Sequence, residues 1–230
     1  MDKRTEASQA AQAEQDQGEF RRLLEGYDRE FRRWREQQVT RADDFSLVEL
    51  LSLVSDENRH SDVLAWLLSA DVYRATHSQG NLGFRIFLAE LGLPAHYADG
   101  DYSVEREVPG KESRVDIEVR GYGEFIIDIE VKIGAGEGEA QLPREWCDLA
   151  QRAESCVVPE AHVHALYLTR NGELPSYPRF RPISWGQIAS VFDKFGEQAK
   201  AESVRWFAGH YAKALRKFIV QQQYEENGDG

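Results

Sequence analysis

Three charged side chains in residues 114–134 share one face of two expected β-strands. The stretch reads RVDIEVRGYGEFIIDIEVKIG, and apolar residues alternate with polar ones on both sides of a glycine-containing turn. The apolar residues of both strands must be buried on one side, so the charged residues share the other side. If the turn centres on Gly123, Asp116 lies opposite Glu130 with their Cβ atoms about 5 Å apart. Lys132 then projects from the same face.

Two carboxylates at that distance repel each other by about 1 kcal/mol in water and by about 4 kcal/mol at an effective dielectric constant of about 20. A divalent cation between them turns this cost into affinity, and Mg²⁺ binds through one or two carboxylates with water and phosphate oxygens as its other ligands. A neighbouring lysine can stabilise the charge that develops on phosphorus. The pattern therefore suits hydrolysis of a phosphodiester.

The alternative interpretation is a solvated strand face that carries charges of both signs. A short pattern of common residues does not by itself decide between the two interpretations. Glu118 and Asp128 share the charged face, and they are the candidate carboxylates if the strand register differs from the expected one.

The charge balance argues against a general nucleic-acid binder. Lys and Arg number 28 and Asp and Glu number 40, which gives a net charge of −12, whereas non-specific binding of phosphates needs clustered positive charge. An enzyme with a local basic groove, or with a metal that supplies positive charge, is not excluded. The basic residues near enough in sequence to line such a groove are Arg106, Lys111, Arg114, Arg144 and Arg152.

Several features predict a cytoplasmic protein with no membrane contact. No apolar run approaches the roughly 20 residues that span a bilayer, and residues 1–20 lack the apolar core of a secretory signal. The two cysteines, Cys147 and Cys156, have no metal-site spacing and are too few for a disulfide framework, so we expect reduced thiols.

The order of elements predicts a mixed α/β domain behind a long N-terminal helix. Residues 8–38 carry an amphipathic stripe, which we expect to pack on the domain; the alternative is a helix that mediates dimerisation or binds a partner protein. Helices, three consecutive strands, a helix, a fourth strand at 162–169 and closing helices follow. Residues 170–182 read as a loop. The expected division is 1–40 for the helical extension, 41–222 for the domain and 223–230 for a disordered tail.

The order of motifs resembles the PD-(D/E)XK nuclease superfamily, and within it a bacterial PDDEXK-like family. The motifs, over residues 45–220, read ENRHSDVLAWLL, HSQGNLGFRIFL, VEREV, RVDIEV, IDIEVKI, EGEAQL, LYLTRNGELP and PISWGQI. The resemblance implies a restriction-endonuclease-like core, in which a mixed central sheet is flanked by helices. It also implies a nucleic-acid substrate and Mg²⁺, or Mn²⁺, as the cofactor.

The resemblance assigns roles to individual residues. Asp116 and Glu130 would be metal ligands and Lys132 the catalytic lysine, while Glu57 would complete the metal shell from a helix. Gln141 would position the water or the phosphate. The remaining motif residues are expected to support the site or the packing: Glu107 and Glu137 around the metal ligands, and His60 and His77 in packing or hydrogen bonding.

Two departures from the family pattern have structural consequences. Family members often have Asn between the Glu and the Lys, where this chain has Val131; this position is expected to face the core, which suits valine. Pro143 follows Gln141 closely, and proline fits only the first turn of a helix. We therefore expect the helix to begin near Gln141 or Leu142, which places Gln141 at the start of the helix and not on its face.

The function that these residues predict is a metal-dependent nuclease, with DNA expected before RNA, and a role in phage defence by analogy with the family. The alternative is a non-catalytic module that keeps the fold and acts through a protein partner. A phosphohydrolase that acts on nucleotides would use the same metal chemistry and is a third candidate.

Overall fold

The computed structural model describes residues 3–41, 45–73, 75–134 and 136–220. The chain divides into two compact units, Met1–Phe45 and Ser46–Gly230. The tail expected at 223–230 lies outside the described residues. Among the helices that the structure describes, none combines the length and the apolar character needed to cross a membrane.

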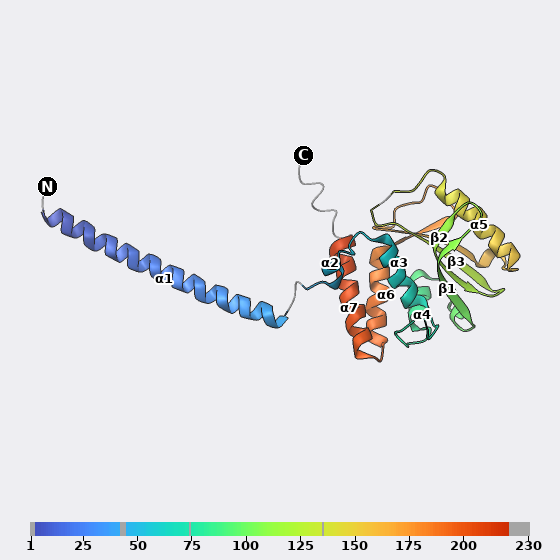
Figure 1. The fold of residues 1–230 in the computed structure, drawn as a ribbon, viewed down its shortest axis with the longest axis horizontal. Helices are drawn as coiled ribbons and strands as arrows, with labels where there is room; N and C mark the ends of the chain where they lie inside the picture. The colour runs from blue at the N-terminus through green and yellow to red at the C-terminus, as the bar shows by residue number, and fades with distance from the viewer. Residues whose placement is uncertain (1–2, 42–44, 74, 135, 221–230) are drawn as a thin grey trace. The chain divides into compact units, whose positions relative to one another are not determined.

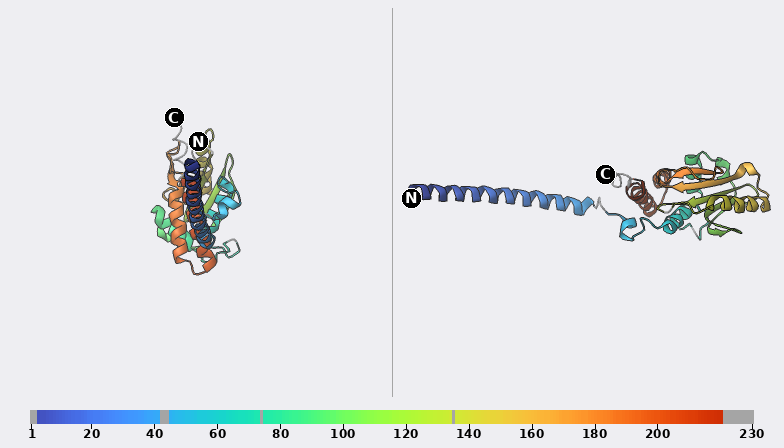
Figure 2. Two further views of the ribbon diagram at one scale, coloured as in Figure 1. Left: turned by 90° about the vertical axis from the view of Figure 1, so that its left-hand side faces the viewer. Right: turned by 90° about the horizontal axis from the view of Figure 1, so that it is seen from above.

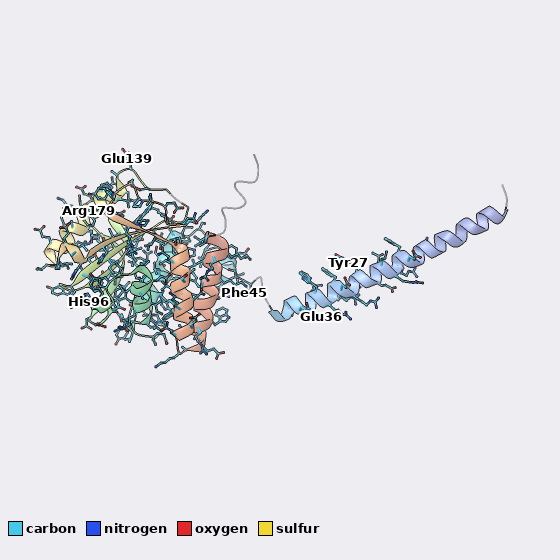
Figure 3. All side chains as sticks on the ribbon, turned by 180° about the vertical axis from the view of Figure 1, so that it is seen from behind. Tyr27, Glu36, Phe45, His96, Glu139 and Arg179 are labelled. Carbon is cyan, nitrogen blue, oxygen red and sulfur yellow. The ribbon has the colours of Figure 1, made fainter. Side chains whose placement is uncertain are left out.

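The first unit is built on one long helix, α1 (Lys3–Arg41). Its expected apolar stripe is present, and Tyr27 stands out from the helix in Figure 3. The large side chains of this stripe are exposed on α1: Phe20, Leu23, Leu24, Tyr27, Phe31 and Trp34.

The second unit contains a five-stranded sheet in the order β1-β2-β3-β4-β5 (Figure 1). The strands are β1 (Tyr102–Pro109), β2 (Arg114–Gly121), β3 (Phe125–Val131), β4 (Val163–Thr169) and β5 (Phe180–Ser184). β2 is antiparallel to both of its neighbours, β1 and β3. β4 is parallel to β3, and β5 is parallel to β4. This mixed sheet flanked by helices confirms the predicted fold class.

The register of the central hairpin agrees with the predicted one. Glu118 pairs with Asp128 and Ile117 with Ile129, so continuing by one residue places Asp116 across from Glu130. Gly123 lies in the turn with φ +68°, a conformation that costs a glycine nothing.

The fifth strand was not predicted. β5 (Phe180–Ser184) falls largely in residues 170–182, which the sequence assigns to a loop. The strand is only five residues long and contains Pro182, and proline indicates a loop because it lacks an N–H. The prediction was wrong because β5 lies at the edge of the sheet, where proline is tolerated.

One face of the sheet carries the larger core. It is covered by α3 (Glu57–Leu68), α4 (Leu82–Leu91) and α6 (Trp185–Gln198), and α7 (Glu202–Leu215) packs against α6 (Figure 1 and Figure 2). Short segments complete this unit: α2 (Leu47–Leu50), η1 (Ala95–Ala98), η2 (Glu160–His162) and η3 (Arg216–Val220). Val131 is fully buried in this core, which confirms that valine suits the position between Glu130 and Lys132.

The other face is covered by α5 (Gln141–Ser155), which packs on Ile126, Ala165 and Tyr167 through Leu142 and Leu149. The charged face of the hairpin is therefore not solvated, and the solvated-face alternative is wrong. Glu118, Asp128 and Glu130 are each exposed by 2% or less, because α5 lies over them.

A partly buried arginine pairs with two of these carboxyl groups. Arg152 of α5 donates to Glu118 Oε2 at 2.8 Å through Nε, and it also donates to Asp128 Oδ2. Arg120 adds a second contact to Glu118 at 3.5 Å. Asp128 Oδ1 has no hydrogen-bond partner, and burial raises the pKa of Asp128 to about 8. Because the hairpin has the predicted register, Glu118 and Asp128 are not the motif carboxylates. Together with Arg152 they form a structural ion cluster beside the motif residues.

The starts of two helices position motif residues. Asp56 caps α3 by accepting from Arg59 N at 3.1 Å, so Glu57 becomes the first residue of that helix. α5 begins at Gln141, as Pro143 predicted, and the proline lies in the first turn where it breaks no helical hydrogen bond.

We expect Arg152→Ala to lower the free energy of unfolding by about 3 kcal/mol, at the low end for breaking a buried ion pair, because Asp128 can take up a proton. Urea denaturation at neutral pH measures this loss. Lys194→Ala is the matched control, since Lys194 pairs with Glu90 at 2.6 Å but is itself 52% exposed, and it should cost less than about 1 kcal/mol. Equal losses in the two variants would contradict the structural role of Arg152.

Candidate active site

Asp116 and Glu130 meet under α5 at the end of the central hairpin. Asp116 Oδ2 accepts a hydrogen bond from Val131 N at 2.9 Å, so the side chain reaches across to the neighbouring strand. Glu130 is 2% exposed. Its Oε1 accepts from Lys132 Nζ at 2.7 Å and from Gln141 Nε2 at 2.5 Å, while its Oε2 is buried without a partner.

Lys132 lies just beyond the last residue of β3 and remains anchored to the sheet. Its backbone N donates to Leu168 O at 2.8 Å, and its carbonyl accepts from Trp185 Nε1 at 3.2 Å. Burial alone would lower the pKa of Lys132, but the carboxylates of Glu130, Glu57 and Asp116 together outweigh burial and raise it. The site therefore holds a fixed positive charge beside Glu130.

Gln141 connects the sheet to α5 through both ends of its amide group. Its Nε2 donates to Glu130 Oε1 and to Glu145 Oε1, the latter at 2.7 Å. Its Oε1 accepts from Gly138 N at 3.1 Å. The predicted position at the start of the helix is the one that directs the amide at Glu130.

Glu145 is a member of the cluster that sequence reasoning missed. It is 3% exposed, and its Oε2 is buried without a hydrogen-bond partner. The signal was available in the helical spacing, because Glu145 falls three residues after Leu142 and four before Leu149 on the buried stripe of α5. A charged residue inside an apolar stripe indicates a buried polar site.

Burial raises the pKa of three carboxyl groups in this cluster, those of Asp116, Glu130 and Glu145. It raises the pKa of Glu130 to about 8, with further contributions from Asp116 and Glu145. It raises the pKa of Glu145 to about 7 and also raises the pKa of Asp116. Glu130 and Glu145 therefore retain protons near neutral pH in the absence of a cation.

The pKa of Asp148, one turn further along α5, is shifted in the opposite direction. Its carboxylate accepts from Lys111 N and Glu112 N at 3.0 Å each, and from Ser113 Oγ at 2.5 Å. Burial alone would raise the pKa of Asp148, but these hydrogen bonds outweigh burial and lower it. A carboxylate under this helix can thus be fully satisfied, which distinguishes Asp148 from Glu130 and Glu145.

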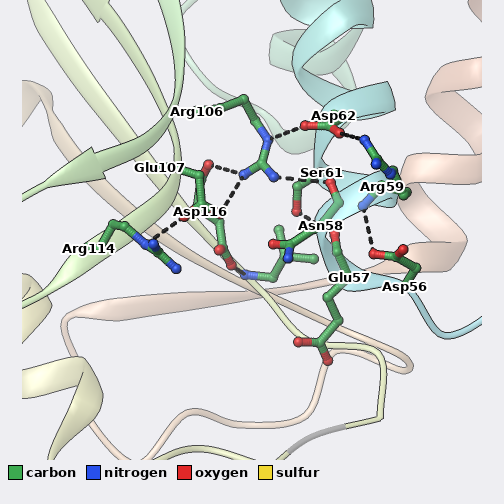
Figure 4. Close-up of polar contacts among 11 residues, drawn as sticks. Asp56, Glu57, Asn58, Arg59, Ser61, Asp62, Arg106, Glu107, Arg114 and Asp116 are labelled. Atoms are coloured by element: carbon green, nitrogen blue, oxygen red, sulfur yellow. Dashed lines mark hydrogen bonds and ion pairs between the residues drawn. The ribbon is translucent and has the colours of Figure 1, made fainter.

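Glu57 reaches the end of β3 from α3. Its Oε1 accepts from Ile133 N at 2.7 Å and from Gly134 N at 3.2 Å. Figure 4 shows its carboxylate turned toward the loop that follows β3. The predicted ligand thus holds the segment that carries Lys132, and its charge also contributes to raising the pKa of Lys132.

Glu107 lies on β1 beside Asp116 in a left-handed conformation, with φ +56°, which is uncommon for a glutamate. Its carboxylate pairs with Arg114 at 2.5 Å and with Arg106 at 3.6 Å. Arg106 also donates to Asp116 O and pairs with Asp62 at 3.1 Å (Figure 4). Backbone strain of this kind is found where function constrains geometry.

The remaining predicted residues have other contacts. Glu137 accepts from Ser176 N at 3.2 Å and from the Ser176 hydroxyl, which ties two loops together. The ring of His60 bonds to the Tyr211 hydroxyl, and that of His77 to the carbonyl oxygens of Trp66 and Ser69. The two histidines are packing and hydrogen-bonding residues, as expected.

The basic residues proposed for a groove divide into two groups. Arg106 and Arg152 have 18% and 17% of their side chains exposed and are bound to carboxylates. Arg114 is 65% exposed although it pairs with Glu107, and Lys111 and Arg144 are also exposed. Exposed positive charge therefore lies beside the hairpin and α5, whereas Arg106 and Arg152 are paired with carboxylates inside the domain.

The carboxylate oxygens of this cluster are suitable ligands for a hard divalent cation. Glu130 Oε2 and Glu145 Oε2 are buried oxygens without partners, and oxygen ligands are those that Mg²⁺ prefers. Within the described residues, no group of three or more His, Cys, Asp or Glu side chains is close enough to hold a metal by itself. One or two carboxylates with water are sufficient for Mg²⁺.

Comparison with known proteins bears on the family alone. A family model described as the PD-(D/E)XK nuclease superfamily matches residues 45–226. No curated protein and no solved structure matches the chain. The match covers most of the chain and includes every element of the sheet and every residue of the cluster. The chain therefore belongs to the PD-(D/E)XK nuclease superfamily.

Proposed function

We propose that this protein is a metal-dependent nuclease that hydrolyses phosphodiester bonds, with DNA as the expected substrate. The observation that carries the proposal is the arrangement around Glu130. A lysine lies at 2.7 Å from one carboxylate oxygen, the other oxygen is buried without a partner, and Asp116 lies across the hairpin. Asp128 also keeps one buried oxygen without a partner, so Glu130 is distinguished by the combination of such an oxygen with the neighbouring lysine and the facing Asp116.

Asp116 and Glu130 are the proposed ligands of Mg²⁺ or Mn²⁺, with Glu57 as the proposed third carboxylate from α3. When bound, such an ion polarises a phosphoryl oxygen and lowers the pKa of a water molecule. Glu107 is proposed to support the site through Arg106, which binds the carbonyl of Asp116. Glu137 is proposed to fix the loop before α5 through Ser176.

Lys132 is the proposed catalytic lysine. Its backbone is held at the end of β3 by hydrogen bonds with Leu168 and Trp185. Its ammonium group donates to Glu130 and is positively charged at neutral pH. A fixed ammonium group can orient a water molecule and stabilise the negative charge that develops on phosphorus. Gln141 is the proposed positioning residue, because its amide group fixes the side chain of Glu130.

Several finer points are part of the proposal. The cytoplasm is the proposed location, which agrees with two free cysteines, Cys147 and Cys156. A role in antiviral defence follows from analogy with the family. The competing function is a non-catalytic module that acts through a protein partner. The net charge of −12 and the enclosure of Arg106 and Arg152 by carboxylates favour this competitor.

We expect the purified protein to cut labelled DNA in Mg²⁺ or Mn²⁺ and to lose this activity in EDTA. Single- and double-stranded DNA and RNA tested in parallel identify the substrate. Lys132→Ala should lower the cleavage rate at least about 100-fold, the usual cost of losing a group that stabilises transition-state charge. Lys194→Ala is the control and should cut at the unaltered rate, because Lys194 pairs with Glu90 on the helical side of the domain. Failure of the unmodified protein to cut any substrate with either metal would favour the non-catalytic module.

Gln141→Ala should lower the cleavage rate by about 10- to 100-fold, the usual effect of removing a group that orients a metal ligand. The side chain of Glu130 then loses one of its two hydrogen bonds. Gln151→Ala on the exposed face of the same helix is the matched control, and single-turnover kinetics compare the two variants. Equal rates would show that Gln141 does not position Glu130 for the reaction.

Binding of Mg²⁺ should depend on pH in a defined direction. The pKa values of Glu130 and Glu145 in the folded protein, about 8 and about 7, lie above the value of about 4.3 for an unfolded glutamate. The stability that these groups contribute is complete below pH about 4 and is lost as the pH rises through about 8. Because ligands must be deprotonated, Mg²⁺ competes with protons for the same oxygens.

Mg²⁺ at about ten times its Kd should therefore stabilise the protein by about 1.4 kcal/mol at pH 8.5, which raises the Tm by about 3–6 °C. At pH 6 the rise should be much smaller. Differential scanning fluorimetry measures both values, and Glu130→Gln should abolish the effect at both pH values. A rise that is larger at pH 6 would contradict the assignment of these carboxylates. This measurement does not depend on cleavage, so it also tests the site if no substrate is cut.

A further inference from the structure

The apolar side chains of α1 form a narrow stripe with the period of a coiled coil. Phe20, Leu24, Tyr27, Phe31 and Trp34 follow one another at intervals of four, three, four and three residues, which is the alternation of a and d positions in a heptad repeat. They are 45% to 71% exposed on α1. The rings of Tyr27 and Phe31 stack at 6.4 Å and those of Phe31 and Trp34 at 5.7 Å, so the aromatic surface is continuous.

The rest of the helix surface agrees with this heptad assignment. With Leu24 and Phe31 at a and Phe20, Tyr27 and Trp34 at d, the outward b, c and f positions from Gly18 to Glu36 hold only glycine, glutamate and arginine. Both glycines of α1, Gly18 and Gly26, fall on this outward face, where a Cβ atom added to either residue would meet nothing within 4 Å. An apolar seam with a wholly polar opposite side is typical of a helix that pairs along the seam.

The charges that flank the seam favour a second copy of the same helix in parallel. In a parallel pair, each g residue faces the e residue of the next heptad on the partner helix. Glu30 at g then faces Arg35 at e, and the two-fold symmetry repeats this opposite-charge pair. In an antiparallel pair that keeps the same seam together, Arg21 faces Arg35, Asp28 faces Asp28 and Glu30 faces Glu30, all of like charge.

We propose that α1 forms a parallel two-stranded coiled coil with α1 of a second copy of this chain, so that the protein is a homodimer. The 3.5-residue period brings the a and d side chains of the two helices into one buried seam with a left-handed supercoil. The proposal rests on α1 alone and does not depend on the nuclease function of the second unit.

Sedimentation equilibrium of the full chain, from roughly 1 to 100 µM, tests the proposal because this range brackets a micromolar Kd. We expect a monomer–dimer equilibrium. Phe31→Glu places a charge at the centre of the seam and should raise the Kd at least about tenfold, as truncating a central interface anchor does. Arg22→Glu introduces the same residue at an outward f position and should change the Kd by less than about twofold.

A charge exchange tests the orientation of the helices. In the parallel arrangement, Arg35→Glu faces Glu30 of the copy, so the Kd should rise roughly tenfold from two symmetric repulsions. The double variant Glu30→Lys/Arg35→Glu should restore the original Kd. In the antiparallel arrangement, Arg35→Glu would face Arg21 and lower the Kd instead.

Three outcomes would overturn the proposal. A monomer at every concentration would mean that the stripe is covered by the chain's own domain or by another protein. A trimer or larger species would exclude two strands. A dimer that Phe31→Glu leaves intact would place the contact on another surface.

Discussion

The burial of carboxylates beneath α5 is the constraint on which the rest of this structure depends. The helix lies over the face of β2 and β3 that carries Glu118, Asp128 and Glu130. A charge removed from water is costly unless it is paired and hydrogen-bonded. Each of these side chains therefore needs a partner that α5 or the strand itself provides, and the partner determines what each carboxylate can do.

Two buried carboxyl groups on β3, those of Asp128 and Glu130, have different kinds of partner. Asp128 shares Arg152 with Glu118, and the guanidinium group joins two strands to a helix. Glu130, two residues further along, receives a lysine and an amide and keeps one oxygen unsatisfied. Both carboxyl groups have a raised pKa and one unpaired oxygen. Asp128 is paired with a guanidinium group that stays charged, which makes its cluster structural, whereas Glu130 faces a second carboxyl group, Asp116, with which it can share a cation.

The cluster around Glu130 lies where the end of β3 meets the starts of α3 and α5. β3 ends beside Glu130, α3 begins with Glu57, and α5 begins with Gln141. Glu57 satisfies the backbone N–H groups of Ile133 and Gly134, which follow the end of β3. The left-handed Glu107 on β1 lies beside the same place. Strain and unsatisfied oxygens in one cluster are features that natural proteins retain where function requires them.

The sequence by itself determined the alternating strands, the register across Gly123, the start of α5 near Pro143 and the pairing of Asp116 with Glu130. These are local properties, because strand alternation, turn residues and the fixed φ of proline act over a few residues. The heptad spacing of α1 is of the same kind. Short-range patterns also carried the resemblance to the family.

Tertiary structure alone decided four matters. It placed α5 over the charged face, which a hairpin pattern cannot reveal because alternation is the same for a solvated face and a covered one. It assigned Arg152 to Glu118 and Asp128, and it brought Glu145 to Gln141 beside Glu130. It also formed β5, whose five residues pair with β4 although they include proline. Each depends on contacts between segments distant in the chain, and local propensity does not encode such contacts.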